Sequence, residues 1–142
     1  MYGKALLEVY DVERHTARVP RIVLAPSAVS LIEGHMRFCP SKAHSPHNRD
    51  LLRDRDGMLF LDYLSGTIFG VEEEAGPFGE ELVTHRDTVV ARLQEFRSDP
   101  NVWPKYEWVG RYHNYSCDTH EVDAQYKIPE VDLAATPALF AD

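Results

Sequence analysis

Seven residues near the middle of the chain, MLFLDYL (residues 58–64), decide the fold. The run is short and apolar on both of its alternating faces, which is typical of a central β-strand. The charged segment RDRDG (residues 53–57) precedes it and predicts a turn that ends at a glycine. Residues 67–71 (TIFGV) can form one further strand. A central strand needs a neighbour on each edge, so we expect part of the sheet to be missing or supplied by another chain.

The chain before this strand alternates between helical and extended patterns. Residues 3–14 carry apolar side chains at helical spacing and predict an amphipathic helix. PRIVL (residues 20–24) predicts a short strand, and residues 27–33 predict two short helical turns closed by Gly34. Proline, serine, histidine and asparagine then dominate, so we expect residues 37–50 to form a surface loop inserted between the elements.

The second half of the sequence is helical. Residues 80–97 place six apolar side chains on one broad stripe, and residues 102–114 repeat the pattern after the breaker SDPN (residues 98–101). We expect residues 79–116 to form a helical extension and residues 117–142 a polar tail draped over the surface. Strands and helices in this order predict an α+β fold.

Composition excludes several functional classes. The chain has 142 residues and a formal charge of −8, whereas general binders of nucleic acid or anionic membranes need a basic face. No apolar run approaches the roughly 20 residues of a membrane helix, and two cysteines are too few for a disulfide framework. We expect a cytoplasmic protein that binds neither nucleic acid nor a membrane.

Asp62 is a candidate functional carboxylate, because strict alternation places it on an apolar strand face with Phe60 and Leu64. Such a group must be paired or hydrogen-bonded, or its pKa rises. It can therefore be a catalytic or ligand-binding acid, or a structural acid bonded to backbone N–H groups or an arginine.

One loop holds the residue types that bind zinc. The pattern H-x3-C-x4-H-x2-H does not match the spacing of structural zinc sites, so an exposed polar loop explains it equally well. A metal-binding regulatory domain built on this loop is a weak alternative. Its residues are His35, Cys39, His44 and His47.

The last predicted helix joins aromatic and polar residues in KYEW (residues 105–108) and RYHN (residues 111–114). These can form a stacking or subunit-contact surface, or they can be core residues of an ordinary packed helix. Phosphate-binding loops, dinucleotide fingerprints, nucleophile elbows and zinc-protease motifs are all missing from the sequence. Spacing alone names no reaction.

Four segments in order resemble a known family. YGKALLEVYDVE (residues 2–13) resembles the helix YGxAVNxAxRLE of class III nucleotidyl cyclases, and residues 20–24 match the strand that follows it. DG with FLDYL (residues 56–64) and KYEWV with YHN (residues 105–114) resemble a bacterial branch of proteins with guanylate cyclase domains. That branch is similar to the pyrimidine cyclases of antiphage defence.

The resemblance implies a partial ferredoxin-like cyclase domain, a few-stranded antiparallel sheet with helices on one face, over residues 1–78. An intact parent would convert a nucleoside triphosphate to a cyclic nucleotide and pyrophosphate with two Mg²⁺ or Mn²⁺, as a homodimer. The two metal-binding aspartates of the family precede the matched helix, so this chain alone is expected to bind no such metal and to be inactive.

The resemblance also assigns positions on the first helix. The nucleotide-facing asparagine and arginine of the family align with Leu7 and Asp11, and Asp11 would repel a triphosphate. Asp62 and His113 are weaker catalytic candidates. The alternative hypothesis is a non-catalytic cyclase-like module that pairs with a partner chain, either a second copy or a missing N-terminal segment.

Overall fold

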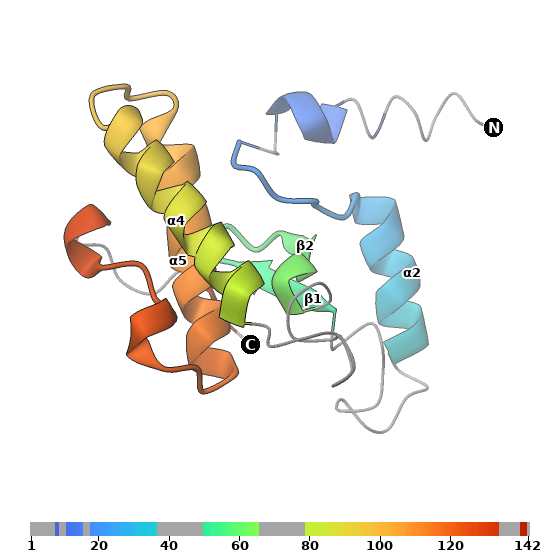
Figure 1. The fold of residues 1–142 in the computed structure, drawn as a ribbon. Coiled ribbons are helices and arrows are strands. Elements are labelled where there is room, and N and C mark those ends of the chain that lie inside the picture. Colours follow the sequence, from blue (N-terminus) through green and yellow to red (C-terminus); the bar gives the residue numbers. More distant parts are fainter. Residues whose placement is uncertain are drawn as a thin grey trace. The chain divides into compact units, whose positions relative to one another are not determined.

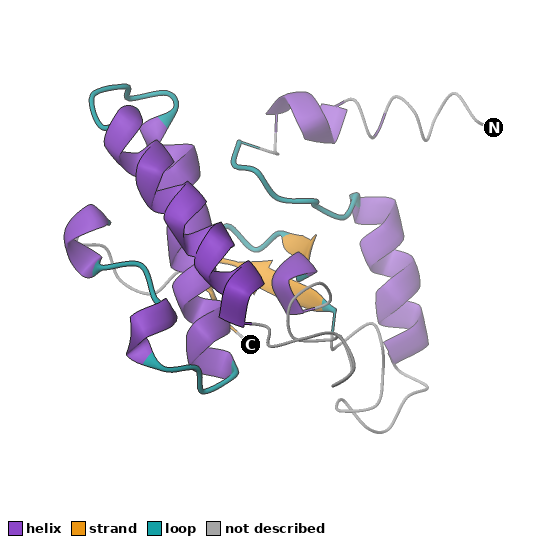
Figure 2. Ribbon diagram, viewed as in Figure 1, coloured by secondary structure: helices purple, strands orange, loops and turns teal. Residues whose placement is uncertain are grey.

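A small antiparallel sheet and a pair of long helices dominate the part of the chain that the computed structural model describes, residues 8, 11–15, 18–36, 50–65, 79–133 and 140–141. Figures 1 and 2 show these elements along the chain and by type. The α+β class is therefore confirmed. The chain divides into two compact units, residues 1–62 with 141–142 and residues 63–140; the sequence had placed a boundary at residue 78.

The sheet of unit 1 is built on a hairpin. Strand β1 (Leu51–Asp54) pairs with β2 (Leu59–Leu61) in antiparallel register, with Leu52 opposite Phe60. The turn closes through the Gly57 N–H, which donates to the Asp54 carbonyl at 2.8 Å. Gly57 has a φ of +84°, a conformation that favours glycine. The turn predicted from RDRDG is thus confirmed, whereas β1 was not predicted.

Strand β2 stands at the end of the strand order, in which β1 is central, so the central position predicted for it is not confirmed. Its second edge faces residues 22–24, where Val23 bridges Phe60 and the Leu24 N–H donates to the Leu59 carbonyl at 2.9 Å. The short strand β3 (Phe140–Ala141) gives the sheet the order β2-β1-β3. The segment PRIVL therefore contributes a single bridge instead of a full strand.

The predicted strand at residues 58–64 is too long. Strand β2 ends at Leu61, and Tyr63 and Leu64 enter a helical turn that belongs to unit 2. The physical reason is a non-local bond, because the buried Leu64 N–H donates to the Tyr112 hydroxyl at 3.0 Å instead of continuing a ladder.

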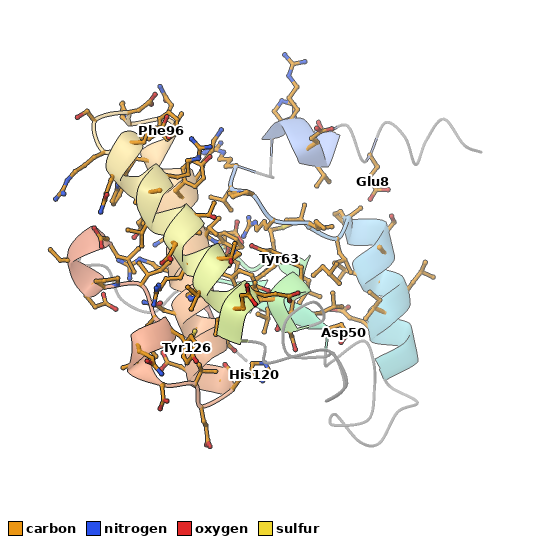
Figure 3. All side chains as sticks on the ribbon, viewed as in Figure 1. Glu8, Asp50, Tyr63, Phe96, His120 and Tyr126 are labelled. Atoms are coloured by element: carbon orange, nitrogen blue, oxygen red, sulfur yellow. The ribbon has the colours of Figure 1, made fainter. Side chains whose placement is uncertain are left out.

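Helix α2 (Pro26–Met36) replaces the two short turns expected at residues 27–33, and it continues through Gly34. Proline at its first position suits a helix start. The Glu8 carboxylate accepts from the backbone N–H of Ser27 at 3.2 Å and from its hydroxyl at 2.9 Å (Figure 3). Residue 8 and residues 11–15 are helical, in agreement with the predicted first helix.

Other expectations lie outside the described residues: the further strand at 67–71, most of the loop at 37–50, and Leu7.

Unit 1 has little apolar core among its described residues. The side chains buried there belong to Phe60, Arg21 and Asp54. Arg21 pairs with Asp54, whose side chain is 4 % exposed, and with Asp56, which is 46 % exposed. The hydrogen bond from Arg21 lowers the pKa of Asp56. Two of the three buried side chains in the described part of this unit therefore belong to an ion pair.

Unit 2 is an antiparallel helical hairpin with a well-packed interior. Helix α4 (Gly79–Glu95) packs against α5 (Trp103–Thr119), and Phe96 stacks on Tyr106 where they are connected. The predicted apolar stripe on α4 is confirmed at Leu82, Val89 and Leu93, which are buried. Helix α5 continues to Thr119, beyond the end expected at residue 114. The buried apolar side chains of this unit are Leu64, Leu82, Val89, Leu93, Trp108, Val109, Tyr112, Cys117, Ile128 and Leu133.

The segment after α5 is packed, in contrast to the surface tail expected from residue 117 onward. It forms two short 3-10 turns, η3 (Ala124–Tyr126) and η4 (Glu130–Asp132). Asn114 holds both backbone groups of Ile128, accepting from its N–H at 2.8 Å and donating to its carbonyl at 2.9 Å. Ile128 is 1 % exposed, so these bonds fix the segment from η3 to Leu133, here called the strap, through a buried residue.

Within the described ranges, no helix combines the length and the apolar character that crossing a membrane requires.

Candidate functional site

Two histidines form the most distinctive polar arrangement in unit 2. His85 on α4 and His113 on α5 have their Nδ1 atoms 2.9 Å apart. Their rings stack with centroids 5.1 Å apart and planes inclined by 6°. His113 is fully buried, and its Nε2 lies 2.8 Å from the Tyr126 carbonyl of η3. The pair thus connects both helices and the strap that follows them.

The partners of each ring nitrogen assign the protons. A carbonyl only accepts, so His113 Nε2 must carry a hydrogen and donate it to Tyr126. Neutral His113 then has a lone pair on Nδ1, and His85 must donate its Nδ1–H to it. His85 Nε2 is therefore left as an acceptor, able to take a proton or a hydrogen bond.

Both rings are held neutral at physiological pH. Burial, and then the proximity of His113, lowers the pKa of His85 to about 4. Burial also lowers the pKa of His113; the bond to Tyr126 opposes this shift and the positive charge of Arg86 adds to it. Arg86 itself donates to the carbonyl of Gln125, the middle residue of η3.

A row of aromatic rings begins beside the pair at Tyr63. The Tyr63 ring is 6.5 Å from that of His85 and 5.0 Å from that of Tyr112, measured between centroids. Trp108 stacks on Tyr112 at 5.5 Å. The core interpretation of the aromatic residues on this helix is therefore confirmed for Trp108, Tyr112 and His113, all of which are buried.

The described sequence candidates belong to two different units of the chain. Asp11 is exposed on the first helix, where its carboxylate lies 2.9 Å from His15 Nδ1. Asp62 is half-buried at the end of the hairpin, and its backbone N–H donates to the Asp50 carbonyl at 2.8 Å. Asp62 belongs to unit 1 and His113 to unit 2.

The loop suggested as a zinc site is not described, because Cys39, His44 and His47 and the side chain of His35 lie outside the described residues. Among the residues that are described, no group of three or more histidine, cysteine or acidic side chains could hold a metal ion. Burial raises the pKa of the Cys117 thiol to about 11, so this cysteine is an unreactive core residue.

Sequence reasoning missed His85. A signal for it exists, because His85 lies three residues after Leu82 and four before Val89, on the buried stripe of α4. A histidine on such a stripe requires a buried partner.

Comparisons with protein-family models, curated proteins and solved structures found no match to this chain.

Proposed function

We propose that this chain is the C-terminal portion of a nucleotidyl cyclase-like protein and that it does not cyclise a nucleotide by itself. In this proposal unit 1 is part of a ferredoxin-like domain, and the strands that carry the metal-binding aspartates come from residues outside the printed sequence. A nucleoside triphosphate and Mg²⁺ or Mn²⁺ would bind only the completed domain.

The observation that carries the proposal is how few apolar side chains are buried among the described residues of unit 1. Phe60 is its one buried apolar side chain among the described residues, whereas unit 2 buries ten. A domain is normally stabilised by a shared apolar core. A sheet with so little core of its own is what one expects of a domain that another polypeptide segment completes.

The order of elements adds support. A helix that contains Asp11 is followed by the bridge at Val23, then α2, then the β1–β2 hairpin. The helix, the extended segment at residues 22–24 and β2 follow one another in the order that the resemblance implies. An exposed carboxylate at Asp11, where the family carries arginine, disfavours binding of a triphosphate by this chain alone.

An activity assay tests the proposal. The purified chain, incubated with Mn²⁺ and each of the four ribonucleoside triphosphates, should give no cyclic nucleotide and no pyrophosphate. The same chain extended by the in-frame sequence upstream of Met1 should give both. Cyclic nucleotide from the chain alone would contradict the proposal, as would an upstream frame that encodes an unrelated complete protein.

A second candidate is a non-catalytic module that pairs with a partner chain, and one surface favours it. Ile22 and Leu61 lie on one face of the sheet, joined by the Leu61 N–H to Ile22 carbonyl bond of 2.9 Å. Ile22 is 61 % exposed and Leu61 37 % exposed. Leu24, Leu51 and Leu59 share this face by register, and none of them is buried.

Light scattering after size-exclusion chromatography tests this surface. If a second copy covers the face, the wild type should be a dimer and Ile22→Lys a monomer. Leu31→Lys is the matched control, because Leu31 is 72 % exposed and belongs to α2, not to the strands. Both candidates would be contradicted by two results together. These are a well-folded wild-type monomer, and no cyclic nucleotide from either the chain or its extended form.

A further inference from the structure

A hollow of about 230 Å³ opens in unit 2 between the end of α4, the start of α5 and η4. Its apolar lining includes Leu93 and Leu133, which are 2 % and 7 % exposed, and the half-buried Trp103. Val131 is 79 % exposed at its edge. The hollow does not involve the histidine pair or any residue of the proposed cyclase-like function.

Three polar side chains complete the lining: Arg97, Gln94 and Asp132. Among the described residues, none of the three makes a side-chain hydrogen bond or ion pair. Arg97 and Asp132 carry opposite charges on the same hollow without pairing with each other. Apolar walls with a few convergent polar groups are the usual features of a small-molecule site.

The wall formed by Trp103 is held in place by the turn before α5. Asp99 accepts from the Val102 N–H at 3.1 Å through its side chain and from the Trp103 N–H at 2.9 Å through its carbonyl. These bonds fix the backbone of Trp103 at the first turn of α5.

The geometry points to an apolar α-amino acid as the ligand of this hollow. The α-carboxylate would bind Arg97, the α-ammonium group Asp132, and the side chain would contact Leu93, Leu133 and Trp103. A volume of about 230 Å³ is below the roughly 300–1,000 Å³ of sites for drug-sized ligands. It suits a molecule of leucine or phenylalanine size and excludes a whole nucleotide.

Binding of L-leucine and L-phenylalanine to the full chain, measured by ligand-observed NMR and by tryptophan fluorescence, tests the inference. We expect saturable binding that weakens by about tenfold or more in Arg97→Gln and in Asp132→Asn, since each loses a charge-assisted hydrogen bond. Glu130→Gln is the matched control. It removes an exposed acid of η4 that does not line the hollow, and should bind as the wild type does.

Ligand analogues separate the two charges. 4-Methylpentanoate lacks the ammonium group and 3-methylbutylamine lacks the carboxylate, so each should bind more weakly than leucine. N-acetyl-L-leucinamide lacks both charges and should not bind. Equal binding of the acetylated amide would assign the hollow to a side chain of a peptide and overturn the inference. No saturable binding up to the solubility of the amino acids, or equal weakening in Glu130→Gln, would overturn it as well.

Discussion

His85 and His113 form a hydrogen-bonded imidazole pair, with Nδ1 atoms 2.9 Å apart and nearly parallel rings. The pair is ordered by the Tyr126 carbonyl, which accepts from His113 Nε2 at 2.8 Å and so fixes which nitrogen of each ring carries a proton. A backbone carbonyl beyond α5 thereby determines which ring nitrogens of the two histidines carry a proton.

The pair makes the stability of unit 2 depend on pH. An unfolded chain binds a proton on His85 near the ordinary pKa of 6.5, whereas the folded chain binds it near pH 4. Between these values the unfolded state holds more protons, so the free energy of unfolding falls as the pH falls. For a half-buried ring we expect His85 to account for a loss of about 1–2 kcal/mol across this window.

Urea unfolding followed by tryptophan fluorescence measures this effect, since both tryptophans lie in unit 2. His85→Asn retains a donor close to the position of Nδ1 but does not titrate, so its stability should fall less between pH 6.5 and 4 than that of the wild type. His120→Gln, at an exposed position outside the pair, is the control. Identical pH profiles for wild type and His85→Asn would contradict the assignment.

Unit 1 should be sensitive to loss of Arg21. Its side chain and that of Asp54 are 3 % and 4 % exposed, so Arg21→Met removes the cation that neutralises a buried carboxylate. Breaking such a pair costs about 3–5 kcal/mol. We expect amide protection from hydrogen exchange to drop sharply at Leu24 and Leu61. Their N–H groups form the hydrogen bonds between residues 22–24 and β2.

Arg55→Gln is the control for this change, because Arg55 is exposed on the same turn. Arg21→Met combined with Asp54→Asn removes the uncompensated charge and should recover part of the protection. Equal exchange in Arg21→Met and Arg55→Gln would show that the buried network does not stabilise the hairpin.

The sequence predicted features that depend on near neighbours. The turn at Gly57 follows from local charge and a glycine, and the presence of strand β2 follows from its unbroken apolar character. The end of β2 was placed too late, because Leu64 is recruited by Tyr112, which is 48 residues away. No local pattern contains that contact.

The same limit applies to the histidine pair. His113 was a candidate, but its partner His85 is 28 residues distant, and their meeting depends on how α4 and α5 align. Helical periodicity predicts that each histidine lies on the inner face of its helix. It does not predict which residues of the two faces come into contact. Ile128 was likewise expected to lie on the surface, because its burial depends on Asn114 of the preceding helix.

Asn114 should be essential to the packed strap. Its amide satisfies both backbone groups of Ile128, so Asn114→Ala leaves a buried N–H and a buried carbonyl without partners. We expect a loss of about 2–3 kcal/mol in the free energy of unfolding. Asn114→Asp should be at least as harmful at neutral pH, because a carboxylate cannot donate to the Ile128 carbonyl.

Ser116 provides the contrast on the same helix. It is 3 % exposed, and its hydroxyl has no hydrogen-bond partner in the described part of the chain. Ser116→Ala removes a buried polar group at no cost in bonds and should leave stability unchanged or slightly higher. Chemical denaturation of the three variants decides the matter, and a loss in Ser116→Ala equal to that in Asn114→Ala would contradict the role given to Asn114.

Two helical glycines should respond in opposite directions to alanine. A Cβ on Gly110 would lie 2.7 Å from Leu133 Cδ2 and 3.4 Å from Ile128 Cδ1, both in the buried strap. Gly110→Ala should therefore lose about 1–3 kcal/mol to overpacking, despite a gain in helix propensity. Gly34 in α2 has nothing within 4 Å of that position, so Gly34→Ala should gain about 0.5–1 kcal/mol.

Thermal unfolding of both variants, with Gly110→Ala combined with Leu133→Ala as a third, separates the two effects. The double variant has room for the added methyl group. Its loss of stability should therefore be smaller than the sum of the losses measured for the two single variants. Strict additivity, or a gain in stability from Gly110→Ala alone, would mean that Leu133 does not pack tightly against α5 at this glycine.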